Sequence, residues 1–158
     1  MLKITKYLLL LLVMIFSSCE KDDDTNINNK SNPFVGKWSI KQIGEIEKIN
    51  NKDILVYQDY PTSGNCESDY IVYNENSTYT FFQVVSVSQN SCTTTEIEKG
   101  SYEFSGNTLT HRFKELVGGQ TVDHHYTFSV VQLSNNTLEL SILNDLGKVS
   151  FLKLQKTY

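Results

Sequence analysis

From residue 34 to the C-terminus, apolar and polar residues alternate with a period of two, the spacing of side chains along a β-strand. Clusters of Asn, Ser and Gly interrupt the alternation, Pro61 is the one proline in this stretch, and no apolar stripe of helical period occurs. One apolar face opposite a face rich in Thr, Ser, Glu and Lys is typical of antiparallel sheets. The expected strands cover residues 35–46, 53–58, 70–74, 78–87, 97–105, 108–117, 120–133, 137–143 and 148–155.

Two tight turns fix the register in the middle of this sheet. Gly118-Gly119 is a two-residue hairpin signal, and it pairs His111 with Tyr126. Gly106-Asn107 is a second such turn, and it pairs Tyr102 with His111. Two independent turns therefore place the same apolar set on one face, and a slip of one residue in either turn would break this agreement.

Two other places leave the register open. A two-residue turn at Asn135-Asn136 puts Leu138 out of phase with Phe128, so we expect either a three-residue loop, Ser134 to Asn136 with an Asn at positive φ, or a bulge in strand 120–133. In the last strand, either of two alternating apolar pairs can face the core. These pairs are Leu152 with Leu154, and Val149 with Phe151.

Strands that follow one another in order form a meander, and such a sheet removes its exposed edges by closing on itself. We therefore predict an all-β fold, an antiparallel up-and-down meander that closes into a small barrel of about 8 strands. A barrel of this size has an interior that side chains fill, or one that holds a single small ligand.

The N-terminus predicts export. Lys3 and Lys6 precede a wholly apolar run, residues 7–16, which has the length of a signal-peptide core and is short for a bilayer span. Phe16-Ser17-Ser18-Cys19 then resembles the lipobox of bacterial lipoproteins, which implies cleavage after residue 18 and lipidation of Cys19, with palmitate among the acyl chains. The alternatives are an ordinary secretory signal with a chance cysteine, or a membrane-anchoring helix.

The segment after Cys19 is expected to be a tether, residues 19–33, acidic at first and then rich in Asn. Its acidic start, residues 20–24, resembles the signal that sends some lipoproteins to the outer face of the outer membrane; the alternative is an ordinary solvated linker. We therefore expect a membrane partner through the lipid anchor and a location on the cell exterior. The barrel domain is expected to occupy residues 34–158.

Charge and cysteine content narrow the classes of function that this chain can have. Removal of Lys3 and Lys6 with the signal leaves 12 basic residues against 18 acidic ones, a net charge of −6, and Arg112 is the one arginine. Nucleic-acid binding is therefore not expected. With Cys19 lipidated, Cys66 and Cys92 form an even pair in an oxidising compartment, which favours a disulfide over redox or zinc chemistry.

The ordered motifs resemble the lipocalin-like domains of bacterial surface lipoproteins. The matching segments are Gly36-Lys37-Trp38, residues 70–74 followed by 78–81, residues 100–109, and residues 126–128 leading to 138–140. The resemblance implies that Trp38 plugs the base of the barrel, where lipocalins pack an arginine of the last strand over the tryptophan; here that strand carries Lys153 and Lys156. It also implies a cysteine pair at Cys66 and Cys92, and ligand binding without a defined chemistry.

The candidate ligand-binding residues lie on the predicted inner face. Tyr102, His111 and Tyr126 form one cross-strand row, and a solvent-reaching cavity would offset the cost of burying their polar atoms. The alternatives are a histidine satisfied by a tyrosine, or a weak two-His metal site with His124; no metal is expected, and His125 points to the opposite face. The full candidate set is Trp38, Tyr79, Phe81, Tyr102, Phe104, His111, His124, Tyr126 and Phe128.

No nucleophile elbow, phosphate loop or zinc-hydrolase motif occurs in the sequence, so we expect no enzyme and no cofactor. The pairs Glu45 with Glu47 and Glu96 with Glu98 are each expected to share one face and to be solvated rim residues. The first hypothesis is a binding module that holds a small apolar or amphipathic molecule in the barrel. The alternative is a structural or protein-interaction module, accessory to cell-surface complexes, with a filled barrel and contacts through loops 47–68 and 86–96.

Overall fold

The computed structural model describes residues 32–88, 91–144 and 146–158, and these residues form an all-β domain. The predicted signal peptide, Cys19 and nearly all of the predicted tether lie outside the described residues. None of the described residues belongs to a helix long and apolar enough to cross a membrane. The strands are β1 (Gly36–Ile49), β2 (Lys52–Asp59), β3 (Tyr70–Tyr73), β4 (Thr78–Ser88), β5 (Ser91–Ser105), β6 (Thr108–Val117), β7 (Gln120–Leu133), β8 (Thr137–Leu143) and β9 (Val149–Thr157).

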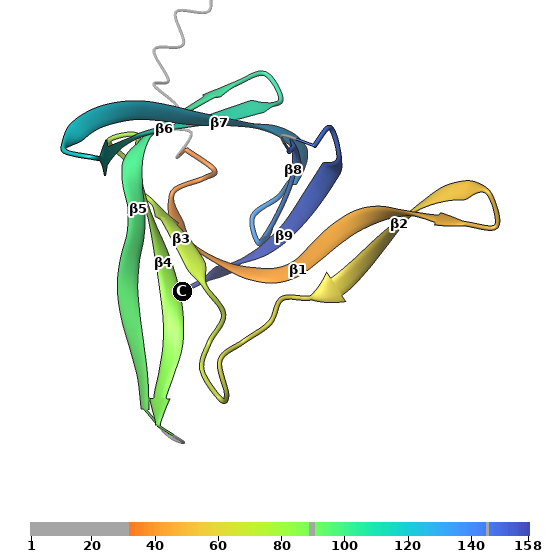
Figure 1. The fold of residues 1–158 in the computed structure, drawn as a ribbon, viewed down its shortest axis with the longest axis horizontal. Coiled ribbons are helices and arrows are strands. Elements are labelled where there is room, and N and C mark those ends of the chain that lie inside the picture. Colours follow the sequence, from red (N-terminus) through yellow and green to blue (C-terminus); the bar gives the residue numbers. More distant parts are fainter. Residues whose placement is uncertain (1–31, 89–90, 145) are drawn as a thin grey trace, which may run out of the picture. The chain divides into compact units, whose positions relative to one another are not determined.

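The strands close into a ring, as predicted. Each strand from β3 to β9 pairs antiparallel with the next, and β1 joins the two ends by pairing with both β3 and β9. Figure 1 looks into this ring, with β6 and β7 across from β1. The second half of β1 pairs with β2, which therefore lies outside the ring of eight strands. The predicted meander and its closure are confirmed.

The registers derived from the two glycine turns are also confirmed. His111 pairs with Tyr126 across β6 and β7, and with Tyr102 across β5 and β6. At Asn135-Asn136 the bulge alternative is correct: Leu133 pairs with Leu138, and the register shifts between Val130 and Gln132. The extra residue at this shift restores the phase, so a three-residue loop is not needed.

In the last strand, the two leucines are the residues that face the core. Leu154 is fully buried in the core and Leu152 packs against it from the same side, whereas Phe151 lies opposite Gly44 on the outer face. On that outer face Tyr57 of β2 crosses Gly44, where a Cβ would lie 2.7 Å from the tyrosine ring. The Tyr57 hydroxyl donates to Glu139 at 2.6 Å, so β2 covers part of the outside of β8 and β9.

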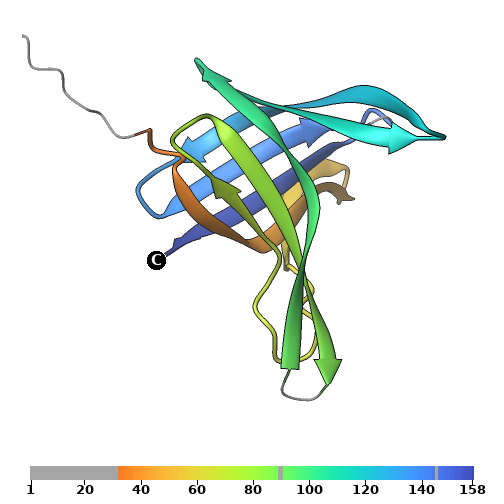
Figure 2. The ribbon, with the colours of Figure 1, turned by 90° about the vertical axis from the view of Figure 1, so that its left-hand side faces the viewer.

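The two ends of the barrel differ. The turns after β3, β5 and β7 lie at one end with Phe34 and Trp38, and we call this end the base. The hairpins β1–β2, β4–β5 and β6–β7 have their tips at the other end, the mouth, and the first two extend away from the ring in different directions (Figures 1 and 2). Residues 86–88 and 91–96, expected as part of a loop, are strand residues of the β4–β5 hairpin, because Thr-rich residues 93–95 pair with Gln83 to Val85. In the other expected loop, 47–68, residues 47–49 and 52–59 belong to the β1–β2 hairpin, and residues 60–68 are irregular.

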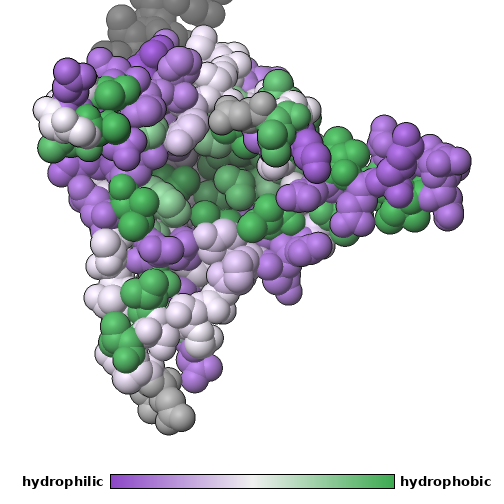
Figure 3. All heavy atoms as spheres, viewed as in Figure 1, coloured by the Kyte–Doolittle hydropathy of each residue, from purple (hydrophilic) through white to green (hydrophobic). Residues whose placement is uncertain are grey.

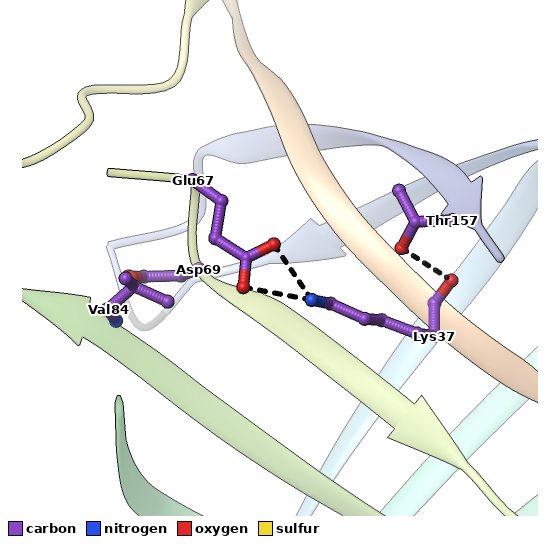
Figure 4. Close-up of polar contacts among 5 residues, drawn as sticks. All are labelled: Lys37, Glu67, Asp69, Val84 and Thr157. Carbon is purple, nitrogen blue, oxygen red and sulfur yellow. Dashed lines mark hydrogen bonds and ion pairs between the residues drawn. The ribbon is translucent and has the colours of Figure 1, made fainter. Parts of the chain in front are cut away.

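The segment from Tyr60 to Asp69 is fastened to the outer face of β4. Asp69 accepts hydrogen bonds from the Val84 amide at 2.8 Å and the Tyr60 hydroxyl at 2.6 Å. Figure 4 shows Glu67, from the same segment, bound by the Lys37 ammonium of β1 at 2.8 and 2.9 Å. Cys66 and Cys92 are joined by the predicted disulfide, which ties the segment to β5.

Candidate functional site

The base of the barrel is filled by side chains. Trp38 is fully buried, its indole nitrogen donates to the Phe34 carbonyl at 2.6 Å, and the Lys156 ammonium lies 5.3 Å from its ring. A lysine thus occupies the place where the resemblance implies an arginine. The other members of the buried cluster are Ile40, Ile71, Tyr73, Tyr79, Tyr102, Leu109, Phe128, Leu138, Leu140 and Leu154. Each fully buried apolar side chain of this kind stabilises the fold by roughly 1.5–3 kcal/mol.

His111 belongs to this core. Its side chain is 3% exposed, its Nε2 is hydrogen-bonded to the Tyr73 hydroxyl at 2.9 Å, and its ring stacks on Tyr79 at 3.9 Å between centroids. Burial lowers the pKa of His111 to about 3 and raises that of Tyr73. Both groups are therefore neutral near pH 7, and each supplies a partner for the other.

Tyr102 is also held by protein partners. Its hydroxyl donates to the Asn74 carbonyl at 3.0 Å and accepts from the Asn32 amide at 2.7 Å. The expected solvent-reaching cavity at the row Tyr102, His111 and Tyr126 is therefore replaced by a hydrogen-bonded core at its first two members. Only Tyr126, which is 46% exposed, reaches the surface.

The remaining candidates are divided between the base and the mouth. Tyr79 and Phe128 lie in the core, and Phe104 packs its ring 4.8 Å from Phe34 near the base. Phe81 is half-buried at the upper edge of the core, and His124 is partly exposed. Within the ranges that the structure describes, no group of three metal-binding side chains occurs.

Above the core, the mouth is hollow and apolar. Phe81, Ile142 and Leu152 are half-buried and pack against the core from this side, whereas Val130 lies nearer the base, where its amide donates to the Asn107 carbonyl at 2.7 Å. Figure 3 shows the hollow inside the ring, with a mainly hydrophobic wall and hydrophilic residues on the surrounding hairpins. The barrel thus combines a filled base with an open apolar mouth, so the sequence alternatives of a filled and an open interior each describe one end.

The sheet also splits at the mouth, between β5 and β6. Their pairing stops at Gly100 and Phe113, although both strands continue further toward the mouth. Gly100 permits this geometry because a Cβ there would lie only 1.9 Å from the Arg112 carbonyl oxygen. Beyond this point β5 stays with β4, and β6 stays with β7. We call the gap between the two strands the fork.

The fork encloses a hollow of about 520 Å³ on the inner side of the sheet. Its lining includes Glu98, Phe113, Glu115, His124 and Tyr126. A second hollow of about 430 Å³ shares Phe113 and His124 with it and is also lined by outward-facing residues such as His125. The fork therefore opens on both faces of the sheet, and solvent reaches aromatic rings that continuous pairing would cover.

Polar groups in the fork are less completely paired than those in the base. Glu98 accepts a hydrogen bond from the Tyr79 hydroxyl, and desolvation raises the pKa of Glu98 in spite of that bond. His124 Nε2 lies 3.4 Å from Glu115 Oε2 but makes no hydrogen bond and is shielded from solvent. Such a group is available to a bound molecule at lower desolvation cost than an exposed one.

Sequence reasoning missed the fork and misplaced one of its acids. A bulge at Ile97 pairs Glu98 with Phe81 but Glu96 with Phe82, so Glu96 and Glu98 do not share a face as expected. The available signal was Gly100, because a glycine inside a strand marks a bulge or a close approach of two backbones.

One family model, that of the lipocalin-like domain, matches residues 34–140, which is most of the described barrel. No curated protein matches the chain.

Proposed function

This chain belongs to the lipocalin-like domain family, and from that premise we propose that it is a binding module for a small apolar or amphipathic molecule. The observation that carries the proposal is the open apolar mouth above a filled base. Small barrels of this kind that enclose a ligand do so at the end not occupied by core side chains. A binding role rather than a catalytic one agrees with the family.

The mouth residues define how deep such a ligand can enter. Phe81, Ile142 and Leu152 give an apolar wall, and the buried layer of Tyr79, His111 and Phe128 lies beneath them. The ligand would therefore rest on the core instead of entering it. Contact with the deeper candidates, Trp38 and Tyr102, is not part of this proposal.

Two neighbouring residues of β8 provide the test. Ile142 faces the mouth and is half-buried, whereas Leu143 is 65% exposed. We expect native mass spectrometry of the full chain, taken from the cells that produce it, to detect a bound small molecule in the wild type and in Leu143→Phe. Ile142→Phe fills the mouth and should lose that mass while its melting temperature stays within a few degrees of the control. An equal bound mass in both variants, or none in any, would overturn the proposal.

The proposal includes a lipid anchor at Cys19 and a location outside the cytoplasm, on the outer membrane. The support is the sequence alone: the apolar run before Cys19, the small residues beside it and the polar segment after it. We expect Cys19→Ala to move the protein from the membrane fraction to the soluble fraction or to arrest it as uncleaved precursor, with the barrel unchanged. Mature-sized Cys19→Ala protein that stays with the outer membrane after a salt wash would contradict the anchor.

A second candidate function is binding of a surface protein. It is favoured by apolar side chains at the hairpin tips of the mouth, of which Leu116, Leu143 and Leu146 are the most exposed. Leu116→Lys with Leu146→Lys should then abolish a specific protein complex and leave the bound small molecule in place. Loss of the small molecule in the same variant would instead assign these tips to the ligand site.

A further inference from the structure

The carboxylates that face the fork are not neutralised by lysine or arginine. Glu98 of β5 and Glu115 of β6 line the same hollow. The two lysines that also border it are paired elsewhere: Lys99 lies 3.3 Å from Glu96, and Lys114 lies 3.6 Å from Asp123. In the part of the chain that the structure describes, no lysine or arginine nitrogen lies within 4.0 Å of Glu98 or Glu115.

The same hollow presents aromatic faces. The Phe113 ring lies 5.2 Å from the His124 ring and 5.4 Å from the Tyr126 ring, and Tyr126 in turn lies 6.4 Å from Phe128 of the core. Aromatic faces attract cations, most strongly where water is partly excluded. Carboxylates beside aromatic rings are therefore a favourable environment for an organic cation and an unfavourable one for an anion.

We propose that the fork binds the ammonium head of a cationic amphipathic ligand, with Glu98 and Glu115 as its counter-charges and Phe113 and Tyr126 as its aromatic walls. The inference rests on the proposed function and specifies the ligand class of the same site. The apolar part of the ligand lies in the mouth, because Phe81 is the direct cross-strand partner of Glu98 and faces that hollow.

Bound ammonium would also satisfy groups that the free protein leaves partly unpaired. Glu98 is desolvated, with the Tyr79 hydroxyl as its hydrogen-bond donor, and a nearby positive charge offsets that desolvation. Among the described residues, His124 is the one basic side chain within 4.0 Å of Glu115, at 3.4 Å and without hydrogen-bond geometry. The two carboxylates come from strands on opposite sides of the fork, so one ligand head can contact both.

The test uses three amphiphiles that share a hexyl chain and differ in the charge of the head group: hexyltrimethylammonium, hexanesulfonate and hexyl glucoside. Each is titrated calorimetrically into the full chain in zwitterionic nanodiscs, with empty nanodiscs as the blank. We expect the ammonium to bind roughly tenfold more tightly than the glucoside, and the sulfonate to bind most weakly. Glu98→Gln combined with Glu115→Gln should abolish the preference, and Glu115→Gln alone should reduce it about threefold.

Glu75→Gln, in the exposed turn between β3 and β4 at the base, removes the same charge far from the fork and should leave the preference unchanged. Equal affinities for ammonium and glucoside, both blocked by Ile142→Phe, would overturn the cation inference and leave the proposed function intact. An ammonium preference that survives in the double variant would also overturn it. If Ile142→Phe blocks none of the three, the proposed function itself fails.

Discussion

The base of the barrel and the fork use the same kinds of side chain on the same strands, with opposite results. On β6, His111 is buried and hydrogen-bonded to Tyr73, whereas Phe113, two residues on, borders a hollow. The difference begins at Gly100, where β6 loses β5 as a neighbour. Pairing on both edges of a strand closes a layer of aromatic rings into core, and loss of one neighbour turns the next layer into a surface that can bind.

The prediction with the largest expected effect compares one aromatic residue of the base with one of the fork. Trp38→Ala should reduce the free energy of unfolding by about 3–5 kcal/mol, because it leaves a large cavity in a filled base. Phe113→Ala should cost about 1 kcal/mol, because its ring already borders a hollow. Denaturant unfolding of the full chain measures both, and similar losses would show that the two regions are packed equally.

Removal of the disulfide, which lies on the mouth side, is expected to have an intermediate effect on the free energy of unfolding. Replacing Cys66 and Cys92 by alanine should lower the free energy of unfolding by about 3 kcal/mol, since the bond closes a loop across residues 66–92. Native Trp38 fluorescence should stay the same, because the base contains neither cysteine. Two free thiols in the denatured, unreduced wild type, or a shifted Trp38 emission in the variant, would contradict this assignment.

The prediction with the smallest effect concerns how the free energy of unfolding changes with pH, and it distinguishes His111 from His124. His111 has a folded-state pKa of about 3, and an unfolded imidazole titrates near 6.5, so between these values only the unfolded state takes up the proton. His111 therefore contributes full stability above pH 6.5 and loses up to about 1.4 kcal/mol per pH unit as the pH falls toward 3.

His111→Leu should remove that slope and, at pH 7, lower stability by about 1–3 kcal/mol, because the Tyr73 hydroxyl loses its partner. His124→Leu, in the fork, should leave the acid slope in place. The measurement is the free energy of unfolding of the three proteins from pH 7.5 to 5. Parallel pH curves for wild type and His111→Leu would mean that the imidazole is not held neutral in the core.

The fold could be predicted from the sequence because its registers and its buried face depend on residues that are close together in the chain. Two-residue turns at Gly106-Asn107 and Gly118-Gly119 set the registers, and period-two alternation set the buried face. The fork could not be predicted in the same way, because it depends on where the pairing between β5 and β6 stops. Nothing in the alternation of β5 distinguishes residues that pair with β6 from those that do not, and the bulge at Ile97 reverses the face of Glu96. The hydrogen bond between His111 and Tyr73 joins residues 38 apart that no turn connects directly.

Closure of the ring has a consequence for how the chain folds. Every neighbouring pair from β3 to β9 is a hairpin, so its contacts form between residues close in sequence, whereas the seam between β1 and β9 pairs Lys37 with Thr157. Bringing such distant segments together costs loop entropy before any contact compensates for it, and folds with distant pairings fold slowly. We therefore expect formation of this seam to limit the folding rate, and Trp38, on the strand that completes it, to report that step by its fluorescence.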